Sequence, residues 1–149
     1  MKKLVIGKSR SIAIVYRPDT AAALTLAKVL TEWLQEKNYK VFTAPEQKPI
    51  AKTTYLRNRE QLGNMSLVIV LGGDGTYLRA VRLLAGKVIP ILGVNLGSLG
   101  FLTPTRADEV FTTVEQTLAD KMELRPRSMI EVRHLTKGKK KQELLALNA

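Results

Sequence analysis

The stretch Leu67-Val68-Ile69-Val70-Leu71-Gly72-Gly73-Asp74-Gly75-Thr76 decides the fold. Its first half, residues 67–71, is a continuous apolar run, which is typical of a central parallel strand buried on both faces. Its second half interrupts the strand with glycines, and Leu78, Val81 and Leu84 then recur at helical spacing. A buried strand, a glycine-rich turn and a helix in this order predict one unit of an α/β sheet.

The segments before this unit continue the alternation of strands and helices. Residues 11–16 are apolar and end at a turn signal, so they predict a buried strand. Residues 20–37 carry apolar side chains at steps of three and four, which predicts an amphipathic helix. Residues 39–43 predict a second strand, and residues 45–64 a loop with a short helix.

The segments after the glycine turn follow the same alternation. Residues 88–94 predict a strand whose regularity Pro90 weakens, because proline cannot donate to a ladder. Residues 105–108 form a capping-box pattern, followed by a helix with the apolar face Val110, Phe111, Val114 and Leu118. The first 120 residues therefore predict a doubly wound α/β layer.

The pattern changes from Lys121 onward. Residues 129–135 alternate in polarity, residues 137–141 are a basic turn, and residues 144–147 are apolar again. This predicts a β-hairpin, which by itself is only marginally stable in water. We therefore expect two parts: an α/β domain over residues 1–120, and over residues 121–149 the first strands of a β-rich domain that this chain does not complete.

The composition restricts the function classes. The chain has 149 residues, 45% of them hydrophobic and 25% charged, which is typical of a globular domain. No apolar run approaches the ~20 residues of a membrane span, and a charge interrupts the start too early for a signal peptide. Absence of cysteine excludes disulfides and thiolate metal sites. We expect a cytoplasmic protein with no membrane partner.

The net charge of +11 suits any polyanionic ligand. Nucleic acid is the usual partner of so basic a domain. Aromatic residues, however, make up only 5% of the chain, so the base-stacking platforms of single-strand binders are scarce. We expect no specific nucleic-acid partner.

The glycine turn has the layout of a phosphate site. Glycines permit positive φ and let backbone N–H groups approach an anion, and a helix N-terminus adds positive potential. In open α/β sheets ligands bind at the carboxyl ends of the strands, where this turn would lie. The turn is neither a Walker A loop nor a complete Gly-x-Gly-x-x-Gly motif.

Asp74 is the unusual member of this turn, because a carboxylate repels phosphate unless it has another task. It could hold a Mg²⁺ ion that bridges the phosphates, or accept a proton from an attacking hydroxyl. Both tasks belong to phosphoryl transfer, and we favour this chemistry. The alternative is a tight turn in which Asp74 binds nearby backbone N–H groups. Arg79, on the following helix, could reach a phosphate or lie on a solvated face.

Two segments resemble a known family. Residues 72–76 are similar to the signature of a kinase superfamily that contains NAD kinases, diacylglycerol and sphingosine lipid kinases and, more distantly, phosphofructokinases. The segment Asn95-Leu96-Gly97-Ser98-Leu99-Gly100-Phe101-Leu102 resembles the NAD kinase pattern Asn-x-Gly-x-Leu-Gly-Phe-Leu, which the lipid kinases lack. The resemblance points to the amino-terminal part of an NAD kinase with a Rossmann-like α/β domain.

This resemblance implies an enzyme that phosphorylates the 2′-hydroxyl of the adenosine ribose of NAD, with ATP as donor and Mg²⁺ or another divalent cation as cofactor. Asp74 would be the catalytic base. The family's nucleotide contacts would carry over to Gly72, Gly73, Gly75, Thr76, Asn95, Gly97, Phe101 and Asn148. Asn148 ends a segment similar to the family's Ala-Leu-Asn-Glu/Asp motif, but Ala149 stands where an acidic residue is expected. Family members commonly form dimers or tetramers, so we expect a homo-oligomer.

Two other functions stay open at this point. A lipid kinase of the same superfamily would share residues 72–76 but not the second segment. A non-catalytic basic module that binds nucleotide or nucleic acid would fit the charge, and its binding would weaken steeply with salt.

Overall fold

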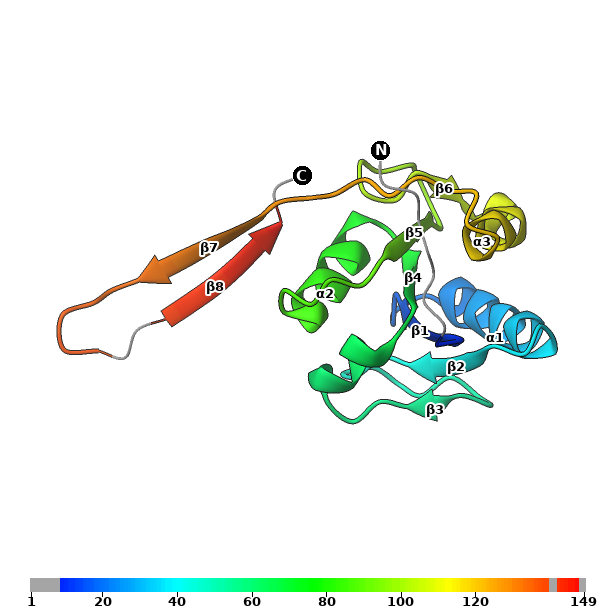
Figure 1. Ribbon diagram of the computed structural model, residues 1–149, viewed down its shortest axis with the longest axis horizontal. Coiled ribbons are helices and arrows are strands. Elements are labelled where there is room, and N and C mark those ends of the chain that lie inside the picture. Colours follow the sequence, from blue (N-terminus) through cyan, green and yellow to red (C-terminus); the bar gives the residue numbers. More distant parts are fainter. Residues whose placement is uncertain (1–8, 140–141, 148–149) are drawn as a thin grey trace.

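A six-stranded parallel sheet forms the centre of the protein, in the computed structural model that describes residues 9–139 and 142–147 (Figure 1). The strand order is β3-β2-β1-β4-β5-β6. The strands are β1 (Ser11–Tyr16), β2 (Lys40–Thr43), β3 (Thr54–Tyr55), β4 (Leu67–Gly72), β5 (Ile91–Asn95) and β6 (Thr105–Arg106). Nucleotide-binding doubly wound folds have this order, so the predicted fold class is confirmed.

Helices cover both faces of this sheet. Helices α1 (Ala21–Glu36) and α3 (Val110–Leu118) pack on one face, where Trp33 meets Phe111 edge-on at 5.4 Å between ring centroids. Helix α2 (Asp74–Leu84) and the 3₁₀ helix η1 (Arg59–Asn64) pack on the other (Figure 1). A second 3₁₀ helix, η2 (Ala107–Glu109), leads into α3.

Strand β4 occupies the middle of the sheet because both of its faces are apolar. Leu67, Ile69 and Leu71 join the core on the α1 side, and Val68 and Val70 join the core on the α2 side. Strand β4 pairs in parallel with β1 on one edge and with β5 on the other. This central position places the glycine turn at the middle of the sheet's carboxyl edge.

Three local expectations need correction. Strand β5 begins at Ile91 rather than at residue 88, since Pro90 contributes only its carbonyl, which accepts from the Val68 N–H at 2.9 Å. The capping box expected at residues 105–108 is absent, because Thr105 lies in β6 and Glu109 is the N-cap of α3, with no side-chain cap. The loop over residues 45–64 contains strand β3 in addition to the expected short helix.

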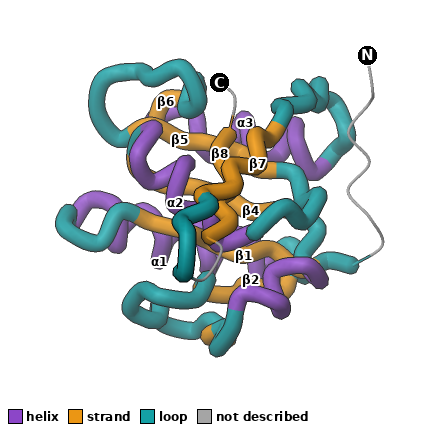
Figure 2. Tube along the Cα trace, turned by 90° about the vertical axis from the view of Figure 1, so that its left-hand side faces the viewer, coloured by secondary structure: helices purple, strands orange, loops and turns teal. Residues whose placement is uncertain are grey.

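Strands β7 (Met129–His134) and β8 (Gln142–Leu147) form the predicted antiparallel hairpin, a sheet of its own. It extends away from the main sheet on the side of α2 (Figures 1 and 2). Leu145 lies beside the end of α2, with its Cδ1 3.6 Å from where a Cβ on Gly86 would be. No helix in the described residues is long and apolar enough to cross a membrane.

Candidate functional site

A cleft of about 370 Å³ opens at the carboxyl ends of β1, β4 and β5. The chain leaves β1 toward β2 and leaves β4 toward β5, so the strand order reverses between these neighbours, and ligands of doubly wound sheets bind at such a switch point. The residues that line the cleft are Arg17, Thr20, Ala22, Gly72, Gly73, Asp74, Asn95, Leu96, Gly97, Ser98 and Gly100.

A second hollow of about 420 Å³ lies at the edge formed by β2 and β3. It is more open than the cleft, and its lysine Lys52 is already paired with Glu32 at 2.8 Å. No carboxylate and no glycine turn line this hollow. We therefore place the candidate site in the smaller cleft, where the strand ends meet.

Asp74, the first residue of α2, is held by donors from a distant loop. Its Oδ2 accepts from the Phe101 N–H at 3.0 Å, and its Oδ1 accepts from the Leu102 N–H at 3.1 Å and the Thr103 hydroxyl at 3.0 Å. Burial raises the pKa of Asp74, but these hydrogen bonds lower it and prevail, so the pKa lies below the ordinary value. The carboxylate is therefore charged at neutral pH and joins α2 to residues 101–103.

Glycines make this contact possible through close approach. A Cβ on Gly100 would collide with the Asp74 carboxylate, and one on Gly93 would lie 2.7 Å from the Leu102 carbonyl oxygen. The expected use of positive φ is wrong for residues 72–76, because the described glycines with positive φ are Gly86 and Gly138. A Cβ on Gly73 or Gly75 would meet nothing within 4 Å, so the backbone there faces open space.

Asn95 lies at the end of β5 with its side chain turned into its own loop. Its Oδ1 accepts from the Gly97 N–H at 2.8 Å, and its Nδ2 donates to the Thr103 hydroxyl oxygen at 2.9 Å. Asn95 is 6% exposed and Thr103 is fully buried. Asn95 and Gly97 line the cleft, and their contact with a dinucleotide stays a prediction. The hydrogen bonds of the Asn95 side chain hold the shape of the loop.

Two helix N-termini face the cleft without side-chain caps. Thr20 and Gly73 are the N-cap residues of α1 and α2, and neither makes a side-chain cap hydrogen bond. The Thr20 hydroxyl is buried and has no partner. Uncapped N–H groups at helix starts carry positive potential and favour anions.

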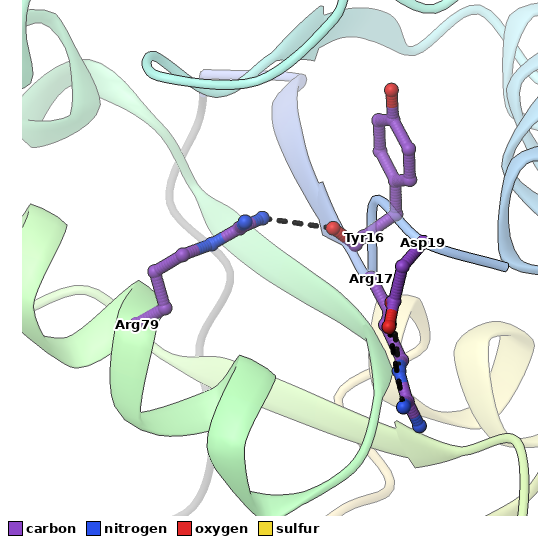
Figure 3. A network of polar contacts seen from close by, with 4 residues as sticks. All are labelled: Tyr16, Arg17, Asp19 and Arg79. Atoms are coloured by element: carbon purple, nitrogen blue, oxygen red, sulfur yellow. Dashed lines mark hydrogen bonds and ion pairs between the residues drawn. The ribbon is translucent and has the colours of Figure 1, made fainter.

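Arg17 adds a cation that the sequence reasoning missed. It follows β1 and lines the cleft, and its Nε lies 2.9 Å from the Asp19 carboxylate in an exposed pair (Figure 3). Its position directly after the first strand was an available signal, because parallel strands end at one edge of a sheet. Together with the helix starts, Arg17 makes the cleft suitable for phosphate groups.

Arg79 lies outside the cleft lining. Its guanidinium donates to the Tyr16 carbonyl at 2.8 Å (Figure 3). It also donates to the Gln47 side-chain oxygen at 2.8 Å. Burial lowers its pKa, although Tyr16 and Glu46 act in the opposite direction. The side chain supports the end of β1 in this arrangement, and its contact with phosphate stays a prediction.

The other predicted site residues differ in position. Gly72 and Gly73 line the cleft, whereas Gly75 and Thr76 lie in the first turn of α2 and are not among the lining residues. The Phe101 ring is 93% exposed, and its backbone N–H holds Asp74. Asn148 lies outside the described residues.

Comparison with known proteins identifies the family. A profile of the ATP-NAD kinase N-terminal domain matches residues 12–122, which include both glycine segments. The chain belongs to the NAD kinase family. The resemblance of the two segments to that family is thus confirmed.

Several NAD kinases resemble this chain. The NAD kinase of Bdellovibrio bacteriovorus is 53% identical over 146 residues, covering 98% of this chain and 48% of that protein. The NAD kinase of Heliobacterium modesticaldum is 33% identical, covering 93% of this chain and 49% of its own length. The chain therefore spans about half the length of these curated relatives.

The fold also has a solved counterpart. The crystal structure of yeast NADH kinase complexed with NADH superimposes with a TM-score of 0.79 at 22% sequence identity. The match covers 93% of this chain and 44% of the yeast chain. At this identity the likeness concerns the fold, and it supports the arrangement of sheet and hairpin.

Proposed function

We propose that this chain carries the phosphoryl-transfer site of an NAD kinase, which moves the γ-phosphoryl group of ATP to the 2′-hydroxyl of the adenosine ribose of NAD. The observation that carries this proposal is the charged carboxylate of Asp74 at the switch point of the sheet, in a cleft that is lined by two helix N-termini without side-chain caps. Membership of the NAD kinase family supports it. We keep the division into domains 1–120 and 121–149 as part of this proposal.

Asp74 has room for one substrate hydroxyl. A carboxylate offers about four acceptor positions. The hydrogen bonds from residues 101–103 place two donors on Oδ1 and one on Oδ2, and the Thr103 N–H also lowers the pKa of the carboxylate. Oδ2 is therefore the oxygen with more room, and it accepts the 2′-hydroxyl of NAD. The hydroxyl oxygen forms the new P–O bond, the β–γ bridging P–O bond of ATP breaks, and the proton passes to Asp74 as ADP leaves.

The lowered pKa of Asp74 defines the kind of help it gives. A weakly basic carboxylate does not take the proton of the 2′-hydroxyl early in the reaction, so its main effect is to orient that hydroxyl. Phosphoryl transfer depends mostly on positioning and charge neutralisation, and the proton is needed late. A low pKa therefore agrees with this reaction.

The phosphates of ATP fit the positive side of the cleft. The open backbone at Gly73, the N-terminus of α1 and the Arg17 guanidinium all face it. Phe101, exposed beside the cleft, offers a ring for packing against NAD. Asn148 keeps its predicted dinucleotide contact within this proposal.

The donor set fits a Mg²⁺ ion that arrives with ATP. Mg²⁺ is usually bound through one or two carboxylates plus substrate phosphates, and Asp74 is the carboxylate that lines the cleft. The described residues contain no group of three acidic or histidine side chains that would bind the ion by themselves. When bound, the ion would neutralise phosphate charge.

The test is a coupled assay for NADP formation from NAD, ATP and Mg²⁺. We would run it on this chain and on a fusion of this chain to the carboxyl-terminal half of the Bdellovibrio relative, since the chain matches 48% of that protein. NADP formation in either protein supports the proposal. A fusion that folds and binds NAD but forms no NADP would overturn it, and a diacylglycerol substrate serves as the comparison for lipid kinase activity.

Replacement of Asp74 by asparagine tests the base. Asp74→Asn keeps the shape but removes the charge that accepts the proton, so we expect kcat to fall by a factor on the order of 10²–10⁴. Asp108→Asn, at an exposed carboxylate paired with Arg106, is the matched control and should keep wild-type turnover. Near-normal turnover of Asp74→Asn would remove Asp74 from the chemistry.

A further inference from the structure

Thr103 directly follows the segment of residues 95–102 and belongs to neither of the two glycine segments. Its side chain is fully buried, and its hydroxyl contacts two polar side chains of the cleft. The Asn95 Nδ2 lies 2.9 Å from the Thr103 Oγ1, which in turn lies 3.0 Å from the Asp74 Oδ1. A hydroxyl at this position connects β5 to α2.

The direction of each hydrogen bond in this chain is fixed by chemistry. The Gly97 N–H can only donate, so the Asn95 side chain must present its oxygen there, at 2.8 Å. The Asn95 nitrogen then points to Thr103, and its N–H groups can only donate. The single hydroxyl proton of Thr103 is therefore directed to Asp74, which matches an ionised carboxylate.

We propose that Thr103 is a positioning residue for the phosphoryl transfer: its hydroxyl holds Oδ1, fixes the rotation of the Asp74 carboxylate and so turns Oδ2 toward the substrate hydroxyl. This proposal rests on the function proposed above. The Phe101 and Leu102 N–H groups belong to a loop backbone, whereas the Thr103 hydroxyl is tied back to Asn95 and so has a fixed direction. A fixed donor keeps the carboxylate oriented while substrate binds.

The test compares two variants of Thr103 in the protein that turns over in the assay above. Thr103→Val keeps the shape but removes the hydroxyl, and we expect kcat to fall roughly tenfold or more, the loss typical of a hydrogen bond to a charged group. KM for NAD and for ATP should change less than about twofold, since the fully buried Thr103 presents no surface to a ligand. Thr103→Ser restores the hydroxyl and should restore most of kcat.

Thr31→Val is the matched control for loss of a buried hydroxyl. Thr31 is also fully buried, but its hydroxyl donates to the Ala27 carbonyl within α1 at 2.7 Å, away from Asp74. Thr31→Val should unfold at a lower temperature than the wild type because it loses a buried hydrogen bond, and its kcat should equal that of the wild type. A kcat loss of equal size in Thr31→Val would attribute the effect to general destabilisation and overturn the proposal.

A second measurement keeps the proposal testable even where turnover is absent. The Asp74 carboxyl carbon is titrated by NMR in this chain, with Asp74→Asn for its assignment. Loss of the Thr103 donor should raise the pKa of Asp74 in Thr103→Val, and Thr103→Ser should return it toward the wild-type value. These variants change no charged or titratable residue in the segments that flank the cleft. Those segments contain Arg17 and Asp19 after β1 and Tyr77 and Arg79 on α2, and residues 95–105 contain none.

The two readouts separate the possible results. A raised pKa alone would make Asp74 a stronger base and would not slow the reaction, so a raised pKa with a lower kcat identifies lost orientation. An unchanged pKa in a folded Thr103→Val would overturn the assigned hydrogen bond. If the wild type turns over and Thr103→Val has the same kcat, the positioning role is overturned and the proposed function stands. If the folded wild-type fusion itself shows no turnover, the proposed function is overturned instead.

Discussion

At the scale of single residues, the partners of Asp74 distinguish a turn from a site. The simple alternative for this aspartate was a local turn in which it binds neighbouring backbone N–H groups. Asp74 does accept backbone hydrogens, but from Phe101 and Leu102, which are 27 and 28 positions away in the chain. The carboxylate therefore joins two segments at the cleft, and the local-turn alternative does not describe it.

Gly100 is the residue whose substitution tests this arrangement most directly. A Cβ at Gly100 would overlap the Asp74 carboxylate, so Gly100→Ala must displace a group that three hydrogen bonds hold in place. We expect kcat for NADP formation to fall at least about tenfold, because small displacements of a catalytic group are costly. The measurement is kcat alongside thermal unfolding.

The control for Gly100→Ala is Gly63→Ala in η1. A Cβ at Gly63 would meet only the flexible Lys87 side chain, at 3.0 Å, so this variant should keep wild-type turnover. Wild-type turnover in Gly100→Ala as well would mean that the Asp74 carboxylate can move without consequence.

At the scale of elements, the sequence predicts best what local pattern determines. Strand β4 is buried on both faces and α1 has a regular apolar stripe, and both were predicted to within one or two residues. Strand β3 has only two residues and is defined by its pairing with β2, where Phe42 lies opposite Thr54. Two residues are too few to show a periodicity in the sequence. The contacts of Thr103 with Asp74 and Asn95 likewise arise only when β5 and α2 meet.

The end of α2 contains a backbone conformation that glycine would suit better. Helix α2 is followed by Ala85 with φ 48° and ψ 45°, in the left-handed region that costs a residue with a Cβ. Ala85→Gly relieves this strain but gains disorder in the unfolded chain, so we expect a net stabilisation of about 0.5 kcal/mol. Denaturant unfolding of this chain measures the free energy of unfolding.

Ala22→Gly is the opposing control for this prediction. Ala22 lies in the first turn of α1 with an exposed side chain, and glycine there should destabilise the protein by up to about 1 kcal/mol. If Ala85→Gly destabilised the chain as much as Ala22→Gly does, the left-handed residue would carry no strain.

At the scale of the whole molecule, the net positive charge is large and unevenly distributed along the chain. Of the net charge of +11, residues 121–149 contribute +5, from eight basic and three acidic residues. The ion pairs of the described residues are solvent-exposed on both sides, such as Arg59 with Glu46 and Lys52 with Glu32. Exposed pairs of this kind contribute little to stability. The net charge therefore acts mainly through the electric potential at the protein surface, which attracts anions.

The salt dependence of the binding affinity distinguishes a nucleotide ligand from a nucleic-acid ligand. A protein that binds duplex DNA through 6–10 phosphate contacts loses about 10³–10⁵ in affinity between 50 and 200 mM salt. NAD carries only a pyrophosphate, so a site that binds it should lose less than about tenfold over the same range, a screening effect. We expect this chain to follow the second pattern in titrations with NAD, and a short DNA duplex to bind only at low salt. A duplex that binds more tightly than NAD at 150 mM salt would favour the non-catalytic nucleic-acid module, because the cleft at Asp74 would then not be the site of tightest binding.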